Sequence, residues 1–247
     1  MIATIKKLTV LLLLATAMVL PVSADINQFR QTINENLKKV NPNYKVVSIE
    51  PSHLKGFYNV QLDNGPLIYV SENGQHFFDG QLYFLDNNRM VNISEQDSAR
   101  ARIALMDQFN PADMIIFSPK APVRTKTHIT VYTDVDCFYC QKLHQEVPEL
   151  NARGIEVRYM AFPRAGIGSP SYKKIVSAWC AKDQQDAMTR LKNREQIPMA
   201  DCDNPVQRHY ELGKKMGVTG TPAIITESGG LIPGYRPAAE MAKALGI

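Results

Sequence analysis

Two cysteines separated by two residues lie where the residue pattern of this chain changes from strand to helix. The run Ile129–Thr133 is a short apolar segment typical of a buried strand, and Cys137-Phe138-Tyr139-Cys140 follows it after a short turn. Apolar residues then recur at helical spacing: Leu143, Val147 and Leu150. A strand that leads directly into a helix at such a motif predicts an α/β architecture for this part of the chain.

The position of the pair predicts its chemistry. The first turn of a helix has unpaired N–H groups and the positive end of the helix dipole, and both stabilise an anion. We therefore expect Cys137 to be an exposed nucleophile with a pKa below the usual value of about 8.5. Cys140 shares the core-facing side of the helix and is predicted to be the buried resolving thiol. Asp134 and Asp136 oppose a low pKa, and we expect the helix terminus to prevail over these solvated carboxylates.

Two alternatives compete with this interpretation. Cys137, Cys140 and His144 have the spacing of zinc ligands, but a structural zinc site needs a fourth ligand, and the remaining cysteines are single and distant. A purely structural disulfide between Cys137 and Cys140 would constrain little chain. We interpret His144 as a solvated helix residue and expect neither a metal nor an organic cofactor.

The remaining pattern after residue 128 alternates between strands and helices. The expected elements are a strand over 155–161, helical residues over 170–192, a helix from Asn204-Pro205 to Gly217, a hairpin of strands 223–226 and 231–233, and a helix near 238–245. This order predicts an α/β domain with a mixed sheet.

The other two cysteines differ from the first pair. Cys180 follows Trp179 on an apolar helix face, and Cys202 lies in a polar loop. A bond between them would stabilise the fold by roughly 3 kcal/mol by restricting the unfolded chain. We interpret them as a structural disulfide, with a second redox pair as the alternative.

A proline that begins a strand is a further candidate site residue. Pro222, in Gly220-Thr221-Pro222-Ala223, precedes the apolar strand 223–226. A cis bond would place the backbone of Thr221 at the cleft, and an ordinary trans turn is the alternative.

The first 24 residues predict a secretory leader. Lys6 and Lys7 precede an apolar run over 8–20, and small residues at Val22 and Ala24 form a cleavage site, so the mature chain is expected to begin at Asp25. The apolar run is shorter than the roughly 20 residues of a membrane-spanning helix, which disfavours an uncleaved anchor. All 4 cysteines of the chain remain after cleavage, in a compartment where disulfides persist.

The segment between the leader and residue 88 predicts a small second unit. Residues 26–40 have the spacing of an amphipathic helix, and five apolar runs broken by turns follow, with hairpin dipeptides at Asn64-Gly65 and Asn73-Gly74. An antiparallel meander of this size has little core and two unpaired edges. Pairing one edge with a second copy would remedy both, so we predict a dimer through this region, with an edge covered inside the monomer as the alternative.

A helix is predicted to join the two units. Ser94 is its expected N-cap, and Asn110-Pro111 its expected end. The apolar positions Ala99, Ile103 and Met106 form a weak stripe, typical of a rigid linker.

The composition of the chain argues against two further classes of protein. The chain of 247 residues is 45% hydrophobic and 21% charged, which excludes a disordered polymer. Its formal net charge is +4, without a long run of one sign, so nothing indicates a nucleic-acid partner.

Together these residues resemble the thioredoxin superfamily and, within it, the bacterial DsbC/DsbG family. The resemblance rests on the two cysteine pairs, the segment Tyr159–Arg164 and the Thr221-Pro222 step, and the stretch 60–65 resembles the family's N-terminal dimerisation domain. It implies a signal peptide (1–24), an α+β dimerisation domain (25–88), a linker helix region (89–118) and a thioredoxin-like catalytic domain with a helical insertion (119–247).

The resemblance also implies partners and roles. The expected protein is a periplasmic homodimer, acting on misfolded secreted proteins that contain disulfides and kept reduced by a membrane thiol-reductase of the DsbD type. Cys137, Cys140, Thr221 and cis-Pro222 match the family's catalytic positions, and Cys180–Cys202 matches its structural disulfide. Phe138 departs from the family's glycine, and Val131 stands where thioredoxin-like reductases have a buried acid.

We therefore expect a protein disulfide isomerase with possible chaperone activity. The alternatives are a DsbG-like reductase of oxidised cysteines, a dithiol oxidase, and a binding module whose cysteines are incidental.

Overall fold

A helix laid on an antiparallel sheet forms the N-terminal part of the chain. The computed structural model describes residues 22–63 and 67–247. Most of the predicted leader and the Asn64-Gly65 turn therefore lie outside the described residues. Helix α1 (Val22–Val40) ends at the last residue of the helix predicted over 26–40, and its apolar face, with Ile33 and Leu37 buried, packs on the sheet. The sheet has the order β1-β2-β3-β4, every pair antiparallel: β1 (Val46–Pro51), β2 (Phe57–Leu62), β3 (Leu67–Ser71) and β4 (Phe77–Asp79).

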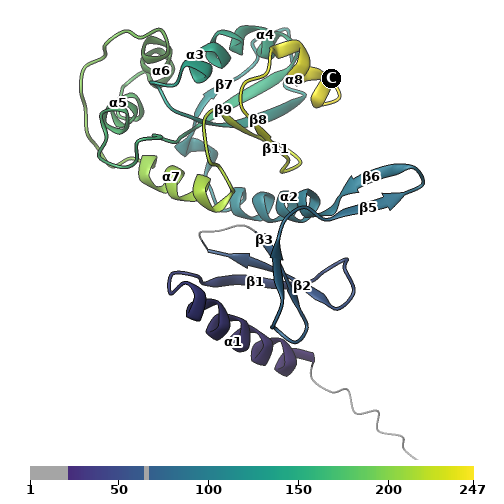
Figure 1. Ribbon diagram of the computed structural model, residues 1–247. Helices are drawn as coiled ribbons and strands as arrows, with labels where there is room; N and C mark the ends of the chain where they lie inside the picture. The colour runs from purple at the N-terminus through teal and green to yellow at the C-terminus, as the bar shows by residue number, and fades with distance from the viewer. Residues whose placement is uncertain (1–21, 64–66) are drawn as a thin grey trace, which may run out of the picture.

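The next two strands form a separate hairpin, which was not predicted in full. Strand β5 (Tyr83–Asp86) pairs with β6 (Arg89–Asn92), and the pair projects away from the body of the molecule (Figure 1). Asn87 and Asn88 connect them with positive φ angles of 42° and 69°, the backbone that a tight type I′ turn requires. The predicted type I′ turn at Asn73-Gly74 is wrong, because only Gly74 has a positive φ there.

Helix α2 (Ile93–Met106) connects the two parts of the chain. Its N-cap is Asn92, whose side chain accepts from the Glu95 amide, and not Ser94 as predicted. The Ser94 hydroxyl instead accepts from the Leu82 amide and bonds to Tyr69, so it ties the helix to the N-terminal sheet. The helix ends four residues before Asn110, which caps the 3-10 turn η1 (Pro111–Asp113).

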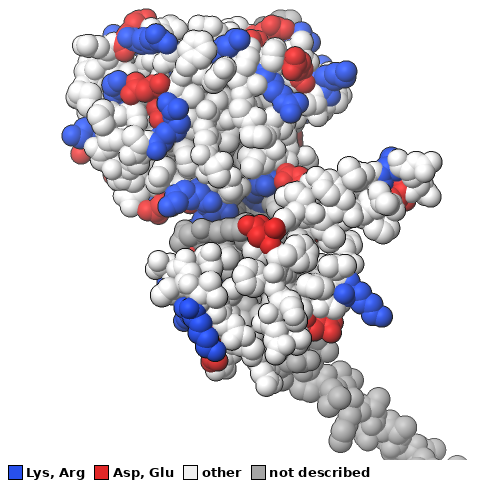
Figure 2. Space-filling view, viewed as in Figure 1, with Lys and Arg blue, Asp and Glu red and all other residues white. Residues whose placement is uncertain are grey.

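Buried Arg102 fastens α2 to the C-terminal part. Its guanidinium donates to the carbonyls of Met216 (3.1 Å) and Gly229 (3.0 Å) and pairs with Glu95 at 2.7 Å. A Cβ on Gly229 would lie 2.2 Å from the Ala99 carbonyl oxygen, so the approach of the two backbones requires glycine. Charged side chains gather where the two parts face each other (Figure 2).

The C-terminal part is built on a mixed sheet, as predicted, and this sheet has five strands. Its order is β11-β10-β8-β9-β7, with β8 and β9 parallel and the other pairs antiparallel. The strands are β7 (Ile115–Phe117), β8 (Thr127–Thr133), β9 (Ile155–Ala161), β10 (Ala223–Thr226) and β11 (Leu231–Pro233). Strand β7, which lies in the segment predicted as linker, was not predicted.

Helices cover this sheet, and two predicted long helices are each broken in two. The helix after the cysteine pair divides into α3 (Phe138–Gln145) and α4 (Val147–Ala152), where Pro148 lies in the first turn of α4. The predicted helix over 170–192 divides into α5 (Pro170–Trp179) and α6 (Gln184–Lys192). Helix α7 (Val206–Lys215) has Met216 as its C-cap and is followed by Gly217, which has a positive φ, and α8 (Ala238–Ala244) is the last helix. No helix within the described ranges is long and apolar enough to cross a membrane.

Candidate active site

Cys137 is the N-cap of α3, directly after the turn that follows β8. We expected an exposed thiol, and this is wrong: only 2% of the residue is accessible, although its neighbours Asp136 and Phe138 are exposed. The reason is the direction of Sγ, which points to the Thr221 carbonyl oxygen at 3.2 Å rather than to solvent. The thiol therefore lies directly beneath the surface, and a reacting disulfide must approach between the exposed side chains beside it.

The surroundings of Cys137 favour its thiolate. A hydrogen bond from the Cys140 thiol lowers the pKa of Cys137 to about 5, against the opposing effect of burial. Thr221, the Cys140 backbone N–H at 3.4 Å and the positive charge of Arg164 add to the lowering. Because this pKa lies well below neutrality, Cys137 is mostly thiolate at pH 7.

Cys140 has the opposite character. It is fully buried in the first turn of α3, and both cysteines of the pair are free thiols. Burial, followed by the hydrogen bond to Cys137, raises the pKa of Cys140 far above its usual value. The pair thus consists of one activated sulfur and one that holds its proton.

The two aspartates before the pair are not alike. Asp134 was expected to be solvated but is 2% exposed, because its carboxylate accepts the backbone amides of Asp136 and Arg164. Asp136 is exposed and pairs with Lys174 at 2.8 Å. The Arg164 guanidinium lies 3.5 Å from Asp134, which offsets its negative charge near Cys137.

His144 is buried and not a solvated helix residue. Its ring nitrogens bond to the Tyr159 hydroxyl at 3.0 Å and to Thr189 Oγ1 at 3.1 Å. Burial, with a contribution from the charge of Lys192, lowers its pKa to about 4, so the ring is neutral at pH 7. In the part of the chain that the structure describes, no group of three or more His, Cys, Asp or Glu side chains is placed to hold a metal ion.

Thr221 and Pro222 reach the pair from the segment before β10. The peptide bond between them is cis, and the Thr221 carbonyl oxygen lies 3.2 Å from Cys137 Sγ. The Thr221 side chain also lies close enough to the Cys137 sulfur to lower the pKa of that thiol. The structure therefore brings together all four residues that the sequence suggested for the reaction.

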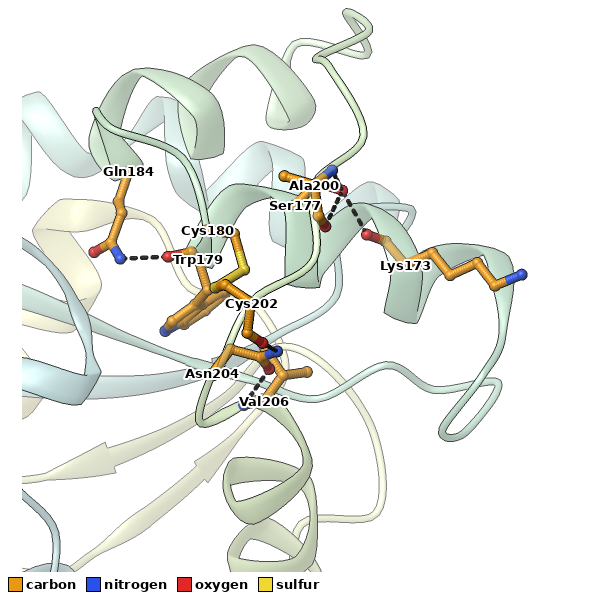
Figure 3. Close-up of a disulfide and its surroundings, with 9 residues drawn as sticks. All are labelled: Lys173, Ser177, Trp179, Cys180, Gln184, Ala200, Cys202, Asn204 and Val206. Carbon is orange, nitrogen blue, oxygen red and sulfur yellow. Dashed lines mark hydrogen bonds between the residues drawn. A yellow bond between two sulfur atoms is a disulfide. The ribbon is translucent and has the colours of Figure 1, made fainter.

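Cys180 and Cys202 are joined in a disulfide, with a Cα–Cα distance of 5.8 Å (Figure 3). It links the end of α5 to the loop before α7. Ser177 supports the same loop, since its hydroxyl accepts from the Ala200 amide at 3.1 Å. Trp179 is buried beside the disulfide, and its indole N–H donates to the Asp113 carbonyl.

One charged residue near the pair was missed by the sequence reasoning. Lys192 is 2% exposed, and its ammonium donates to Thr133 Oγ1 and to the Asp134 carbonyl. No local pattern signals it, because a lysine in the last turn of a helix is usually solvated and favoured there by the helix dipole.

Comparison with known proteins decides the family. The family model described as a thioredoxin-like domain matches residues 120–246, and the model described as the N-terminal domain of disulfide bond isomerase proteins matches residues 21–95. The chain is 37% identical over 201 residues to the thiol:disulfide interchange protein DsbC of Escherichia coli (strain K12), covering 81% of each chain. The DsbC of Dickeya dadantii (strain 3937) is 36% identical over 236 residues, which cover 96% of this chain and 93% of that protein.

The chain belongs to the DsbC family. It is therefore a thiol–disulfide oxidoreductase, with the two-part fold of DsbC-family proteins. Among solved structures, the disulfide interchange protein from Neisseria gonorrhoeae is 26% identical, with a TM-score of 0.48, and the match covers 56% of this chain and 96% of that one.

Proposed function

We propose that this DsbC-family chain is a protein disulfide isomerase in which Cys137 attacks and Cys140 resolves. The observation that carries the proposal is the difference in pKa between the two thiols. Cys137 has a pKa of about 5 and is ready to attack, whereas burial holds the pKa of Cys140 high and keeps it protonated. A slow resolving thiol gives a second substrate thiol time to act, and that favours shuffling over net reduction.

The exchange begins with the Cys137 thiolate. It attacks one sulfur of a non-native disulfide, so a mixed disulfide forms and the other substrate sulfur leaves as a thiolate with the electron pair. Another substrate thiolate then attacks the same substrate sulfur and releases Cys137, which leaves the enzyme unchanged and the substrate rearranged. If Cys140 attacks first, a Cys137–Cys140 disulfide forms and the substrate is reduced by two electrons.

Aromatic side chains next to Cys137 support binding of unfolded chains. Phe138 and Tyr139 are 60% and 55% exposed and contact each other edge to face. Tyr139 also stacks on Tyr235 at a centroid distance of 6.4 Å. Exposed rings of this kind bind the apolar side chains that misfolded polypeptides leave in solvent.

The same proposal includes a homodimer through the N-terminal part. Large apolar side chains are exposed on the β5–β6 hairpin, with Phe84 at 58%, Leu85 at 77% and Met90 at 68%. The protruding arm is mostly uncharged in the space-filling view (Figure 2). A second copy that covers this hairpin would bury these side chains and an open strand edge together.

Disrupting this surface should separate the copies. Replacing Leu85 and Met90 by lysine places two charges in the proposed contact, so we expect the chain to sediment as a monomer where the unaltered protein sediments as a dimer. Ile167→Lys, on an exposed apolar residue of the C-terminal part, is the matched control. Unaltered protein that sediments as a monomer at micromolar concentration would exclude the dimer.

The predicted leader supports secretion, and a periplasmic location follows for a bacterial protein of this family. There the substrates would be misfolded secreted proteins that contain disulfides. A membrane thiol-reductase of the DsbD type would return the Cys137–Cys140 pair to the dithiol after each reductive turnover. These partners are proposed on the family resemblance.

Replacing Cys140 by serine distinguishes isomerase activity from reductase activity. Since shuffling needs only Cys137, we expect Cys140→Ser to keep at least about a tenth of the rate at which a scrambled multi-disulfide protein is rearranged. Net reduction of the same substrate should fall at least about 100-fold, and mixed disulfides should accumulate. Equal loss of both activities would indicate a reductase and reject the proposal.

A further inference from the structure

Lys192 places its ammonium in the interior, where it is hydrogen-bonded to two neutral oxygen atoms. The residue ends α6, and its ammonium donates to Thr133 Oγ1 at 2.5 Å and to the Asp134 carbonyl oxygen at 3.0 Å. Among the described residues, Lys192 forms no ion pair within 4.0 Å, and the charges of Asp134 and of the cysteine pair act on it from farther away. A buried ammonium without an ion pair is costly, because only hydrogen bonds to neutral groups replace its hydration.

The ammonium is anchored at the cysteine pair. The Asp134 carbonyl that accepts from Lys192 also accepts the backbone N–H of Cys137 at 3.3 Å. The positive charge of Lys192 lowers the pKa of Cys140, in opposition to the burial that raises it. Burial lowers the pKa of Lys192 itself, and negative charge on Cys140 counters that effect.

Other charged groups also face Lys192: burial lowers its pKa, and Asp134, Cys137 and Asp136, besides Cys140, counter that effect. From the turn after β8, Asp134 bonds to Arg164, and Asp136 is exposed and pairs with Lys174. From α3, His144 is neutral at pH 7. From β9, the Tyr159 ring lies 5.6 Å from Nζ, and burial raises the pKa of its hydroxyl, so it stays protonated.

A further negative charge arises there when the mixed disulfide is resolved. To resolve a mixed disulfide, the fully buried Cys140 must lose its proton, and Val131 offers no acid–base group on β8. We propose that Lys192 is a positioning residue that stabilises the Cys140 thiolate during resolution and so sets how long the mixed disulfide on Cys137 survives. This inference rests on the proposed function.

The step balances as an exchange within the chain. The proton of Cys140 leaves for solvent, or for the Lys192 amine when that amine is neutral, and the thiolate attacks Cys137 Sγ. The Cys137–Cys140 bond forms and the bond from Cys137 to the substrate sulfur breaks. The substrate sulfur leaves with the electron pair and is reduced, while the cysteine pair is oxidised.

Two chromogenic phases test Lys192 directly. The reduced full-length protein reacts with 5,5′-dithiobis(2-nitrobenzoate), so the first aromatic thiolate reports attack by Cys137 and the second reports resolution by Cys140. We expect Lys192→Met to change the first phase less than about threefold. The second phase should slow about tenfold at pH 7, with its pH profile moved up by about one unit, because one unit of pKa is tenfold in thiolate.

Two further variants make the result decisive. Lys192→Gln keeps a hydrogen-bond donor for Thr133 but removes the charge, so it should slow the second phase as Lys192→Met does. If Lys192→Met does not fold, Lys192→Gln provides the same test. Lys182→Met removes an exposed lysine and should change neither phase. The role of Lys192 would be overturned if folded Lys192→Met showed an unaltered rate of the second phase, or if Lys192→Gln reacted in that phase as fast as the unaltered protein. Loss of the first phase from the unaltered protein would instead reject the proposed function.

Discussion

Cys137→Ser is expected to abolish rearrangement of a scrambled multi-disulfide protein, lowering the rate at least about 100-fold to that of the uncatalysed reaction. The thiolate is the nucleophile in disulfide exchange, and a serine hydroxyl is not ionised at neutral pH. Cys140 cannot substitute, since it is fully buried and its pKa is raised. The measurement is recovery of activity by the scrambled substrate in a glutathione buffer.

The same variant separates catalysis from binding. The exposed rings of Phe138 and Tyr139 and the N-terminal part are unchanged by Cys137→Ser, so we expect suppression of aggregation of an unfolded protein to remain within twofold. Cys140→Ser is the matched control, with the same substitution three residues away. Unaltered rearrangement by Cys137→Ser would make the cysteines incidental and leave a binding protein.

The parts of the site that depend on local sequence could be predicted. The strand before Cys137, the helix after it and the hairpin behind Pro222 all have strong patterns over a few residues. The burial of Cys140 also follows from its place on the apolar face of α3, which it shares with Leu143. These features depend on propensity and periodicity, which the chain carries within short windows.

The missed features depend on contacts between distant segments. Cys137 is covered because Thr221, far along the chain, places its carbonyl against Sγ. His144 is buried because β9 and α6 supply Tyr159 and Thr189, and Lys192 is buried because Thr133 and Asp134 accept from it. The sequence around a helical residue does not indicate which other elements will cover that residue in the folded chain.

Short turns and breaks were missed for a different reason. Asn-Gly is the common sequence signal for a type I′ turn, but here Asn87-Asn88 adopts the left-handed backbone of that turn. Asn73-Gly74 carries the Asn-Gly signal and forms a different turn. Strand β7 has only three residues, too few for a period, and is defined by its pairing with β9. The helix breaks after Gln145 and Trp179 interrupt apolar patterns that continue on both sides.

Removal of the Cys180–Cys202 disulfide is expected to lower the free energy of unfolding of the C-terminal part by about 3 kcal/mol. The bond joins residues at a sequence separation of 22, and a loop of this size restricts the unfolded chain by about that amount. The variant is Cys180→Ala with Cys202→Ala. Cys137→Ser with Cys140→Ser serves as the common background, so that no free thiol pairs wrongly.

Urea unfolding followed by tryptophan fluorescence measures this loss. The chain has 1 tryptophan, Trp179, which is buried next to Cys180, so its emission reports the part that the disulfide constrains. With a typical urea dependence of about 1–3 kcal/mol per molar, the midpoint should fall by roughly 1–3 M. A midpoint unchanged within about 0.3 M would show that hydrogen bonds such as Ser177 to Ala200 hold the loop without the disulfide.

The disulfide should matter for stability and not for attack by Cys137. Cys137 is positioned by β8, α3 and the Thr221 carbonyl, and among the described residues no hydrogen bond of its thiol involves the loop that Cys202 anchors. With the active pair restored, we therefore expect the double alanine variant, at a temperature where it is folded, to react with an aromatic disulfide within twofold of the unaltered rate. A first phase slowed more than tenfold in the folded variant would mean that the α5 disulfide also holds the nucleophile in place.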